Sequence, residues 1–209
     1  MTVRVLPCGD RAVLLEVAGL AEVLALDASL RSDPPAGVVD IVPAARTVLL
    51  RLAADADLAA TRRHLDALTV VAPDQLGSGE VVEIPTSYDG ADLDDVASLL
   101  GLARQELVAV HTGQVWTVAF CGFAPGFAYL TGADERLASV PRLATPRTRV
   151  PAGSVALAGG FSAVYPSASP GGWQLIGRTD RRVFDVDRDP PALLRPGTRV
   201  RFTDRAHTR

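Results

Sequence analysis

The sequence predicts an α+β protein in two parts, a small α+β domain over residues 1–84 and a β-barrel domain over residues 85–209. Short strand patterns alternate with two helical patterns in the first part. Short strands between turn residues fill the second part, where Gly and Pro become frequent after residue 120. A chain of 209 residues is long enough for one large or two small domains.

The first part contains both helical patterns. Leu20–Leu30 has apolar residues at helical spacing and ends before a Pro pair, and Leu58–Leu68 follows Asp57, a suitable N-cap residue. Two helices over one antiparallel sheet make an α+β layer, and we expect a small ferredoxin-like domain. The expected strands are Val3–Leu6, Ala12–Glu16, Val38–Val42, Thr47–Arg51 and Val81–Ile84.

The boundary between the two parts falls near Gly77–Gly79, which predicts a linker, or near Pro85–Gly90. Leu93–Leu100 and Arg104–His111 predict two short helices, the first ended by Gly101. The remaining candidate strands are short and separated by turn residues, which favours a closed or nearly closed β-barrel. They are Val115–Phe120, Val155–Leu157, Ala163–Tyr165, Gln174–Ile176, Val183–Asp185 and Arg199–Phe202.

Composition excludes several classes of function. The formal net charge is −3 and no basic stripe is visible, which argues against nucleic acid as a partner. No apolar run reaches the length of about 18 residues that a membrane span needs. No signal-peptide pattern is present, and Cys8 and Cys121 have no metal-ligand spacing, so we expect a reduced, cytoplasmic protein without a metal site.

Between residues 120 and 179 the chain is dense in Gly, Pro, Arg and aromatic residues. Loops of this composition, displayed on a rigid scaffold, commonly carry function. The glycines of the sequence GFAPGF allow a tight turn and close approach of a ligand, and its rings supply apolar walls. The alternative is a turn that only closes the barrel, with rings packed in the core. We expect substrate contacts from Gly122, Phe123, Pro125, Gly126 and Phe127.

Arg142, Arg147 and Arg178 are the strongest catalytic candidates. A guanidinium fork binds a carboxylate or phosphate in bidentate fashion. No Asp or Glu occurs between residues 137 and 179, so a local ion pair is not expected, although Asp180 and Asp185 remain long-range alternatives. The alternative role for each arginine is to hold loops together.

His111 and Trp173 complete the candidate site. His111 follows a helix and precedes the barrel, and histidine titrates near neutral pH, which suits acid–base catalysis. Trp173 suits a pocket wall or an anchor for a partner protein. The alternative for both is core packing. Further candidate substrate-binding residues in the turns are Pro151, Gly153, Ser154 and Gly172.

Two common catalytic motifs are missing from the sequence. It contains no GxxxxGK[ST] pattern, so the chain has no P-loop of its own for nucleotide. Ser154 follows Gly153 but does not fit the GxSxG nucleophile elbow.

Taken together, five segments resemble the family of allophanate hydrolase subunit 1, also called the carboxyltransferase-domain C/D family. The resemblance covers most of the C-terminal domain, and the combination is specific although each piece alone is not. The segments are PTSYDGADLDDVASLLGL (Pro85–Leu102), HTGQVWTVAFCGFAPGFAYLTG (His111–Gly132), PRLATPRTRVPAGSVALAG (Pro141–Gly159), YPSASPGGWQLIGRT (Tyr165–Thr179) and LLRPGTRVRF (Leu193–Phe202).

The resemblance implies a cyclophilin-like β-barrel after the N-terminal domain. It also implies a cytoplasmic hetero-oligomer with the family's subunit 2, a second cyclophilin-like chain of the carboxyltransferase subdomain A/B type, and potentially a third subunit. The implied reaction uses ATP, which the partner subunits would share or carry.

The activity that the resemblance favours is that of a 5-oxoprolinase subunit, which opens 5-oxoproline to glutamate with ATP. A related alternative is carboxyl transfer in an allophanate hydrolase or urea carboxylase. A different alternative follows from a family member that inhibits a sporulation histidine kinase: a protein-binding module without catalysis. The family commonly has a Gln-Thr pair where this chain has Phe161-Ser162, which puts the identity of the substrate in question.

Overall fold

The computed structural model describes residues 2–70 and 80–206. The chain divides into two compact units, Met1–Leu76 and Gly77–Arg209. The predicted Gly77–Gly79 linker lies outside the described residues. No helix among the described residues is long and apolar enough to cross a membrane.

The first unit contains one antiparallel sheet with the strand order β1-β2-β4-β3. Burial alternates along β2 and β4 because successive side chains point to opposite faces, so Val13, Leu15, Val48 and Leu50 share one buried face. The strands are β1 (Arg4–Pro7), β2 (Ala12–Glu16), β3 (Val38–Pro43) and β4 (Thr47–Leu52).

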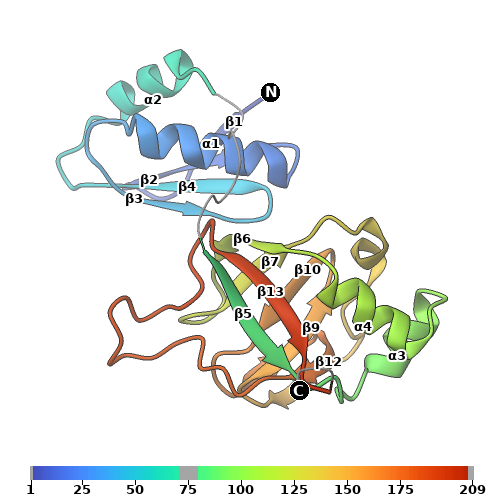
Figure 1. The fold of residues 1–209 in the computed structure, drawn as a ribbon. Helices are drawn as coiled ribbons and strands as arrows, with labels where there is room; N and C mark the ends of the chain where they lie inside the picture. The colour runs from blue at the N-terminus through green and yellow to red at the C-terminus, as the bar shows by residue number, and fades with distance from the viewer. Residues whose placement is uncertain (1, 71–79, 207–209) are drawn as a thin grey trace. The chain divides into compact units, whose positions relative to one another are not determined.

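Helices α1 (Leu20–Ser32) and α2 (Leu58–Ala67) lie over the same face of this sheet (Figure 1). Leu26 and Leu30 of α1 are fully buried in the core that the sheet forms with the helices. The predicted N-cap of α2 is confirmed, because the Asp57 carboxylate accepts a hydrogen bond of 2.8 Å from the backbone N–H of Ala59.

The ferredoxin-like part of the fold prediction is not confirmed. A ferredoxin-like domain has the element order β-α-β-β-α-β. The described order is β-β-α-β-β-α, because β1 turns back on β2 as a hairpin at the start of the chain. The strand after α2, β5 (Val81–Thr86), falls within the predicted first domain, but it pairs in parallel with β13 (Arg199–Asp204) in the second unit. Ile84 of β5 is buried in the core of that unit.

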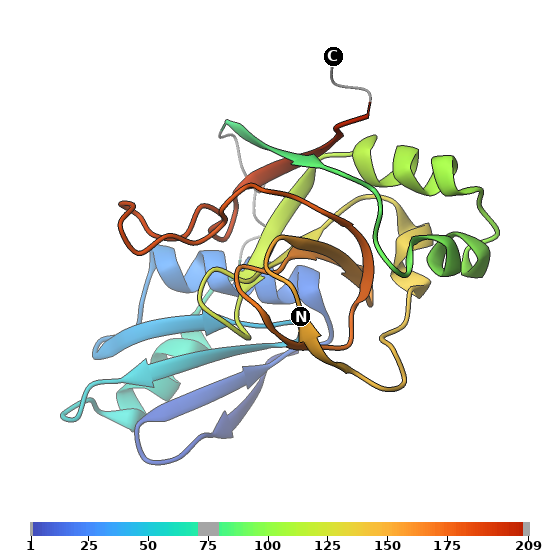
Figure 2. The same ribbon diagram turned by 90° about the horizontal axis from the view of Figure 1, so that it is seen from below.

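The second unit is a nearly closed, barrel-like sheet of seven strands. The strand order is β12-β9-β10-β7-β6-β13-β5. The strands not yet given are β6 (Trp116–Cys121), β7 (Ala128–Thr131), β9 (Ser154–Ala158), β10 (Phe161–Val164) and β12 (Gln174–Arg178). Figures 1 and 2 show the long connection from β12 to β13 as a loop that leaves the sheet.

Residues that follow β5 bring the two edges of this sheet together. Ser87 and Arg178 exchange two backbone hydrogen bonds, of 2.8 and 2.9 Å. The chain then runs along β12, where the N–H of Gly90 bonds to the carbonyl of Ile176. A side chain at Gly90 or Gly177 would collide with the opposite backbone, so both positions require glycine.

The two faces of the barrel sheet pack into different clusters. On β9, Val155 and Leu157 face the main core, which also receives apolar residues of the helices, whereas Ala156 and Ala158 face the opposite way. The helices are α3 (Leu93–Leu99), α4 (Arg104–Thr112) and the 3-10 turn η1 (Glu135–Ser139). Figures 1 and 2 show α3 and α4 beside each other at one side of the barrel.

The segment from 141 to 171 contains a two-stranded ribbon that the sequence did not predict. It consists of β8 (Arg147–Val150) and β11 (Ser169–Gly171), which pair in antiparallel fashion outside the main sheet. The predicted strand at Val183–Asp185 is wrong. Only an isolated bridge joins Phe184 to Ala192 there.

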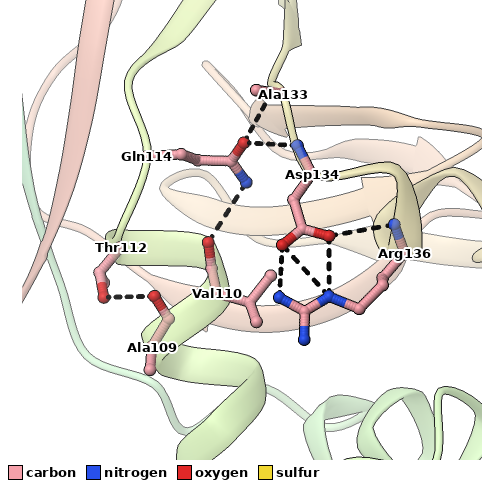
Figure 3. A network of polar contacts seen from close by, with 7 residues as sticks. All are labelled: Ala109, Val110, Thr112, Gln114, Ala133, Asp134 and Arg136. Atoms are coloured by element: carbon pink, nitrogen blue, oxygen red, sulfur yellow. Dashed lines mark hydrogen bonds and ion pairs between the residues drawn. The ribbon is translucent and has the colours of Figure 1, made fainter.

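The Gln114 side chain joins the end of α4 to the turn that leads into η1 (Figure 3). Its amide N–H donates to the Val110 carbonyl, and its oxygen accepts from the backbone N–H groups of Ala133 and Asp134 at 2.7 and 3.1 Å. Asp134 in turn binds the Arg136 guanidinium. The network fixes a turn whose backbone N–H groups have no other partner among the described residues.

Candidate functional site

Seven aromatic side chains gather on the barrel face opposite the main core, and we call this group the aromatic face. Phe120 stacks on Tyr129 with 4.4 Å between ring centroids, and Phe127 meets Tyr165 and Trp173 edge-on at 5.2 and 5.5 Å. Such edge-to-face and offset arrangements are favourable for aromatic pairs. The members are Phe120, Phe123, Phe127, Tyr129, Phe161, Tyr165 and Trp173.

Small residues of the sheet make room for these rings. Ala156 and Ala158 of β9 and Ala163 of β10 are buried beneath them in the same cluster. Phe127, Tyr165 and Trp173 are almost completely buried, so they form the base of the aromatic face and expose little surface to a ligand. The sequence identified Phe127 and Trp173 as candidate binding residues, and the structure gives both mainly a packing role.

Phe123 differs from the other rings because it is 62% exposed. It lies at the tip of the β6–β7 hairpin, beside the exposed Gly122 and Pro125. Its backbone φ is +69°, in the left-handed region, which costs an L-residue about 1–2 kcal/mol. Gly126, also at positive φ, packs against Phe184 so closely that no side chain would fit.

Arg142 is the arginine that remains available at the aromatic face. It is exposed, and no ion pair or hydrogen bond of its side chain is found among residues 2–70 and 80–206. Burial raises the pKa of Tyr129 and Tyr165, and the positive charge of Arg142 opposes this rise at both hydroxyl groups. The loop that carries Arg142 is held at the aromatic face by the hydrogen bond from the backbone N–H of Leu143 to the carbonyl of Gly172, next to Trp173.

Arg147 of β8 is held by a carboxylate that the sequence did not point to. Its Nη2 lies 2.6 Å from Oδ1 of Asp92, whose side chain is only 7% exposed. The second oxygen of Asp92 accepts a hydrogen bond from the backbone N–H of Leu175. Nη1 of Arg147 is buried without a hydrogen-bond partner, which is costly for a charged donor.

Arg178, at the end of β12, forms an exposed ion pair. It pairs with Asp89 at 2.8 Å, and both side chains are largely exposed. The partners foreseen as alternatives, Asp180 and Asp185, bind Arg205 and Arg182 instead. Two of the three candidate arginines are therefore engaged in ion pairs.

His111 is completely buried, with a hydrogen bond to each ring nitrogen. Nδ1 lies 2.7 Å from the Tyr88 hydroxyl and Nε2 lies 2.9 Å from Oγ of Ser162. Burial lowers the pKa of His111 to about 3. A neutral, enclosed imidazole of this kind holds α4 to β10, and it offers no nitrogen to a substrate in this conformation.

The turn residues between β8 and β9 have structural partners. The Ser154 hydroxyl donates to the Pro151 carbonyl at 2.9 Å, and the N–H of Gly153 bonds to the carbonyl of Tyr165. Gly153 has φ of +78° and lies against the Thr179 carbonyl. These contacts shape the strand connection. Gly172, also a candidate, accepts a backbone hydrogen bond from Leu143 and so anchors the loop that carries Arg142.

The Phe161-Ser162 departure from the family pattern falls at the site. Phe161 is part of the aromatic face and meets Tyr129 edge-on at 5.7 Å, whereas Ser162 points the opposite way to His111. The Phe161 ring therefore adds to the apolar character of the aromatic face.

A large cavity of about 1010 Å³ lies between α4 and β13, away from the aromatic face. Its lining includes Tyr88, Arg104, Thr112, Arg201 and Phe202. Arg104 is bound by both oxygens of Asp94. No cluster of three metal-ligating side chains occurs in the described part of the chain, and both cysteines are free.

The barrel-like sheet and its aromatic face lie in a domain of the carboxyltransferase type. A family model described as the carboxyltransferase domain, subdomain C and D, matches residues 3–194, and the chain belongs to this family. The family expected from the sequence is thereby confirmed.

Curated relatives are named as the B subunit of 5-oxoprolinase. The protein from Escherichia coli O157:H7 is 51% identical over 124 residues, which cover 58% of this chain and 56% of the relative. The protein from Bacillus subtilis (strain 168) is 44% identical over 138 residues, which cover 65% of this chain and 57% of the relative. The matches therefore span little more than half of each relative's length.

Solved structures share the fold. TTHA0988 is 39% identical with a TM-score of 0.76, and the match covers 93% of this chain and 40% of that one. The urea carboxylase of Kluyveromyces lactis is 20% identical with a TM-score of 0.70, and the match covers 97% of this chain and 22% of that one. The second likeness concerns the fold alone.

Proposed function

We propose that this chain is a subunit of an ATP-dependent 5-oxoprolinase, which opens 5-oxoproline to glutamate together with a subunit 2 partner. The observation that carries the proposal is its identity of 44–51% to proteins named as the B subunit of 5-oxoprolinase. The aromatic face supports it, since a compact apolar surface with one available guanidinium suits a small ring that bears a carboxylate.

The reaction balances with two waters. The lactam C–N bond breaks, one water supplies the hydroxyl group of the new carboxyl and a proton of the new amine, and the other hydrolyses ATP to ADP and phosphate. Lactams are poor electrophiles, and ATP would supply the activation when bound in the complex.

We assign ATP to the partner subunits. A triphosphate needs several cationic or N–H donors around it. At the aromatic face Arg147 is committed to Asp92, which leaves Arg142 as a single cation for a ligand. This face therefore suits a small monoanion better than a nucleotide. We further place the complex in the cytoplasm and describe the second unit as cyclophilin-like, as the family resemblance implies.

The test is reconstitution with purified subunits. The chain and its candidate partner subunits are incubated with 5-oxoproline and ATP, and glutamate and ADP are measured over time. The expected result is release of both in equal amounts, with no glutamate when ATP or any one subunit is left out. Absence of turnover with the complete set of subunits would contradict the proposal. Inhibition of a histidine kinase by the chain alone would instead favour the binding-module alternative.

A further inference from the structure

The backbone of Phe123 is the starting point. It is the one non-glycine residue at positive φ in the described ranges 2–70 and 80–206. Glycine and asparagine adopt the left-handed region readily, whereas a bulky side chain there is a genuine outlier. Since strain of this kind concentrates at functional positions, the ring at position 123 requires an explanation beyond the turn itself.

The hairpin tip holds this conformation firmly. The N–H of Gly122 bonds to the carbonyl of Phe127 at 3.1 Å, and the N–H of Phe127 bonds to the carbonyl of Ala124 at 3.0 Å. The close contact of Gly126 with Phe184 supports the tip from the β12–β13 connection. The ring is therefore presented in a fixed place rather than on a free loop.

The Phe123 ring packs in T-shaped pairs with two other rings of the aromatic face. It is nearly perpendicular to Phe127, with centroids 5.1 Å apart, and to Tyr165, with centroids 6.4 Å apart. These contacts leave 62% of the residue exposed. Arg142 precedes Leu143, whose backbone N–H bonds to the carbonyl of Gly172 at 2.7 Å, next to Trp173 of the aromatic face. An exposed ring and an exposed guanidinium are thus both carried by loops at the aromatic face.

We propose that Phe123 and Arg142 form the 5-oxoproline subsite of the complex on this subunit. The lactam ring packs against the open side of the Phe123 ring, and the carboxylate pairs with the Arg142 guanidinium. This inference rests on the proposed function and assigns the recognition of the substrate to this chain. Neither residue takes part in bond breaking, so both determine specificity.

The role of Phe123 is tested by variants that distinguish the effect of losing its ring from the effect of relieving its backbone strain. Phe123→Gly and Phe123→Asn remove the ring and suit the left-handed backbone, whereas Phe123→Ala removes the ring and keeps the strain. We expect the thermal midpoint of Phe123→Gly and Phe123→Asn to equal or exceed that of Phe123→Ala. In the assembled complex all three should raise KM for 5-oxoproline about 10-fold or more with a smaller change in kcat.

The role of Arg142 is tested by comparing the binding of two ligands, one with and one without a carboxylate. Calorimetric titration of the chain should show tighter binding of 5-oxoproline than of 2-pyrrolidone, which has the same ring without the carboxylate. Arg142→Ala should weaken binding of 5-oxoproline about 10–100-fold and remove the preference, as expected for loss of a charge-assisted hydrogen bond. Arg136→Ala, which removes a remote exposed arginine paired with Asp134, is the matched control and should change nothing.

The outcomes separate the subsite from the function. If the complex turns over 5-oxoproline and the Phe123 and Arg142 variants leave both KM and binding unchanged, the subsite is wrong while the proposed function stands. If Phe123→Asn instead weakens assembly with the partner subunit at unchanged KM, the exposed ring is a docking residue and the proposal is overturned. If the chain prefers 5-oxoproline and the complete complex shows no turnover, the function is wrong and the binding site stands.

Discussion

The Asp92 carboxylate binds two parts of the barrel unit at once, since its oxygens lie 2.6 Å from Nη2 of Arg147 and 2.6 Å from the backbone N of Leu175. Asp92 precedes α3, Arg147 begins β8 and Leu175 lies in β12. The orientation of Arg147 at the edge of the aromatic face is therefore set by a carboxylate 55 positions away in the chain.

The first prediction concerns this ion pair. Asp92→Asn should lower the free energy of unfolding by about 1–3 kcal/mol, because it leaves a partly buried guanidinium without its counter-charge. Urea denaturation measures the effect. Asp94→Asn is the control, because its pair with Arg104 is exposed and should contribute about 0–1 kcal/mol. Equal losses in the two variants would contradict the structural importance of Asp92.

The second prediction is a pH dependence from His111. Burial lowers its pKa from 6.5 to about 3. Between these values the unfolded chain binds a proton that the folded protein does not, so stability falls as the pH drops below 6.5. The slope approaches about 1.4 kcal/mol per pH unit.

His111→Asn should remove this slope, whatever its effect on stability at neutral pH. Urea midpoints between about pH 7 and pH 5 show the change before most carboxylates titrate. His64→Asn, at a partly exposed position of the first unit, serves as the control and should keep the slope. An unchanged slope in His111→Asn would mean that this imidazole is accessible to protons in the folded state.

The third prediction tests the closure of the barrel. A Cβ at Gly177 would lie 2.6 Å from the carbonyl oxygen of Ser87 and 3.0 Å from Cγ2 of Thr86. Because the first contact is with backbone, Gly177→Ala should cost about 1–3 kcal/mol of stability. Gly122→Ala is the matched control, since no atom lies within 4 Å of its added Cβ. Chemical denaturation of both variants measures the cost, and a neutral Gly177→Ala would show that the two sheet edges do not meet as described.

The fourth prediction concerns the network in Figure 3. Gln114→Ala removes the acceptor of the Ala133 and Asp134 N–H groups and should cost about 1–2 kcal/mol. Gln114→Glu keeps an acceptor for both groups but places its second oxygen against the Val110 carbonyl, so its thermal midpoint should also lie below that of the wild type. An alanine variant as stable as the wild type would contradict the role assigned to the Gln114 oxygen.

Sequence patterns predicted several elements in place. The strand Ala12–Glu16 is a short apolar run after a turn, the helix from Leu20 has apolar residues at helical spacing, and both occur in the structure. β8 and β11 were not predicted, because RTRV and SPG have no apolar alternation. Their strand conformation comes from pairing with each other rather than from local preference.

The site was harder to predict than the fold. Composition identified the segment that supplies most of the aromatic face, but burial depends on tertiary packing, so Phe127 and the exposed Phe123 could not be distinguished in advance. The partner of Arg147 could not be predicted either, because Asp92 is far from it in the sequence and comes close only in the folded chain. Both ring nitrogens of His111 likewise find partners in distant segments.

One short connection, residues 87–92, closes the barrel through Ser87 and carries both Asp89 and Asp92. A shift of this connection would move the carboxylates that pair with Arg178 and Arg147. A partner protein bound to these few residues would therefore change the ion pairs at two strand ends together, without contacting either strand.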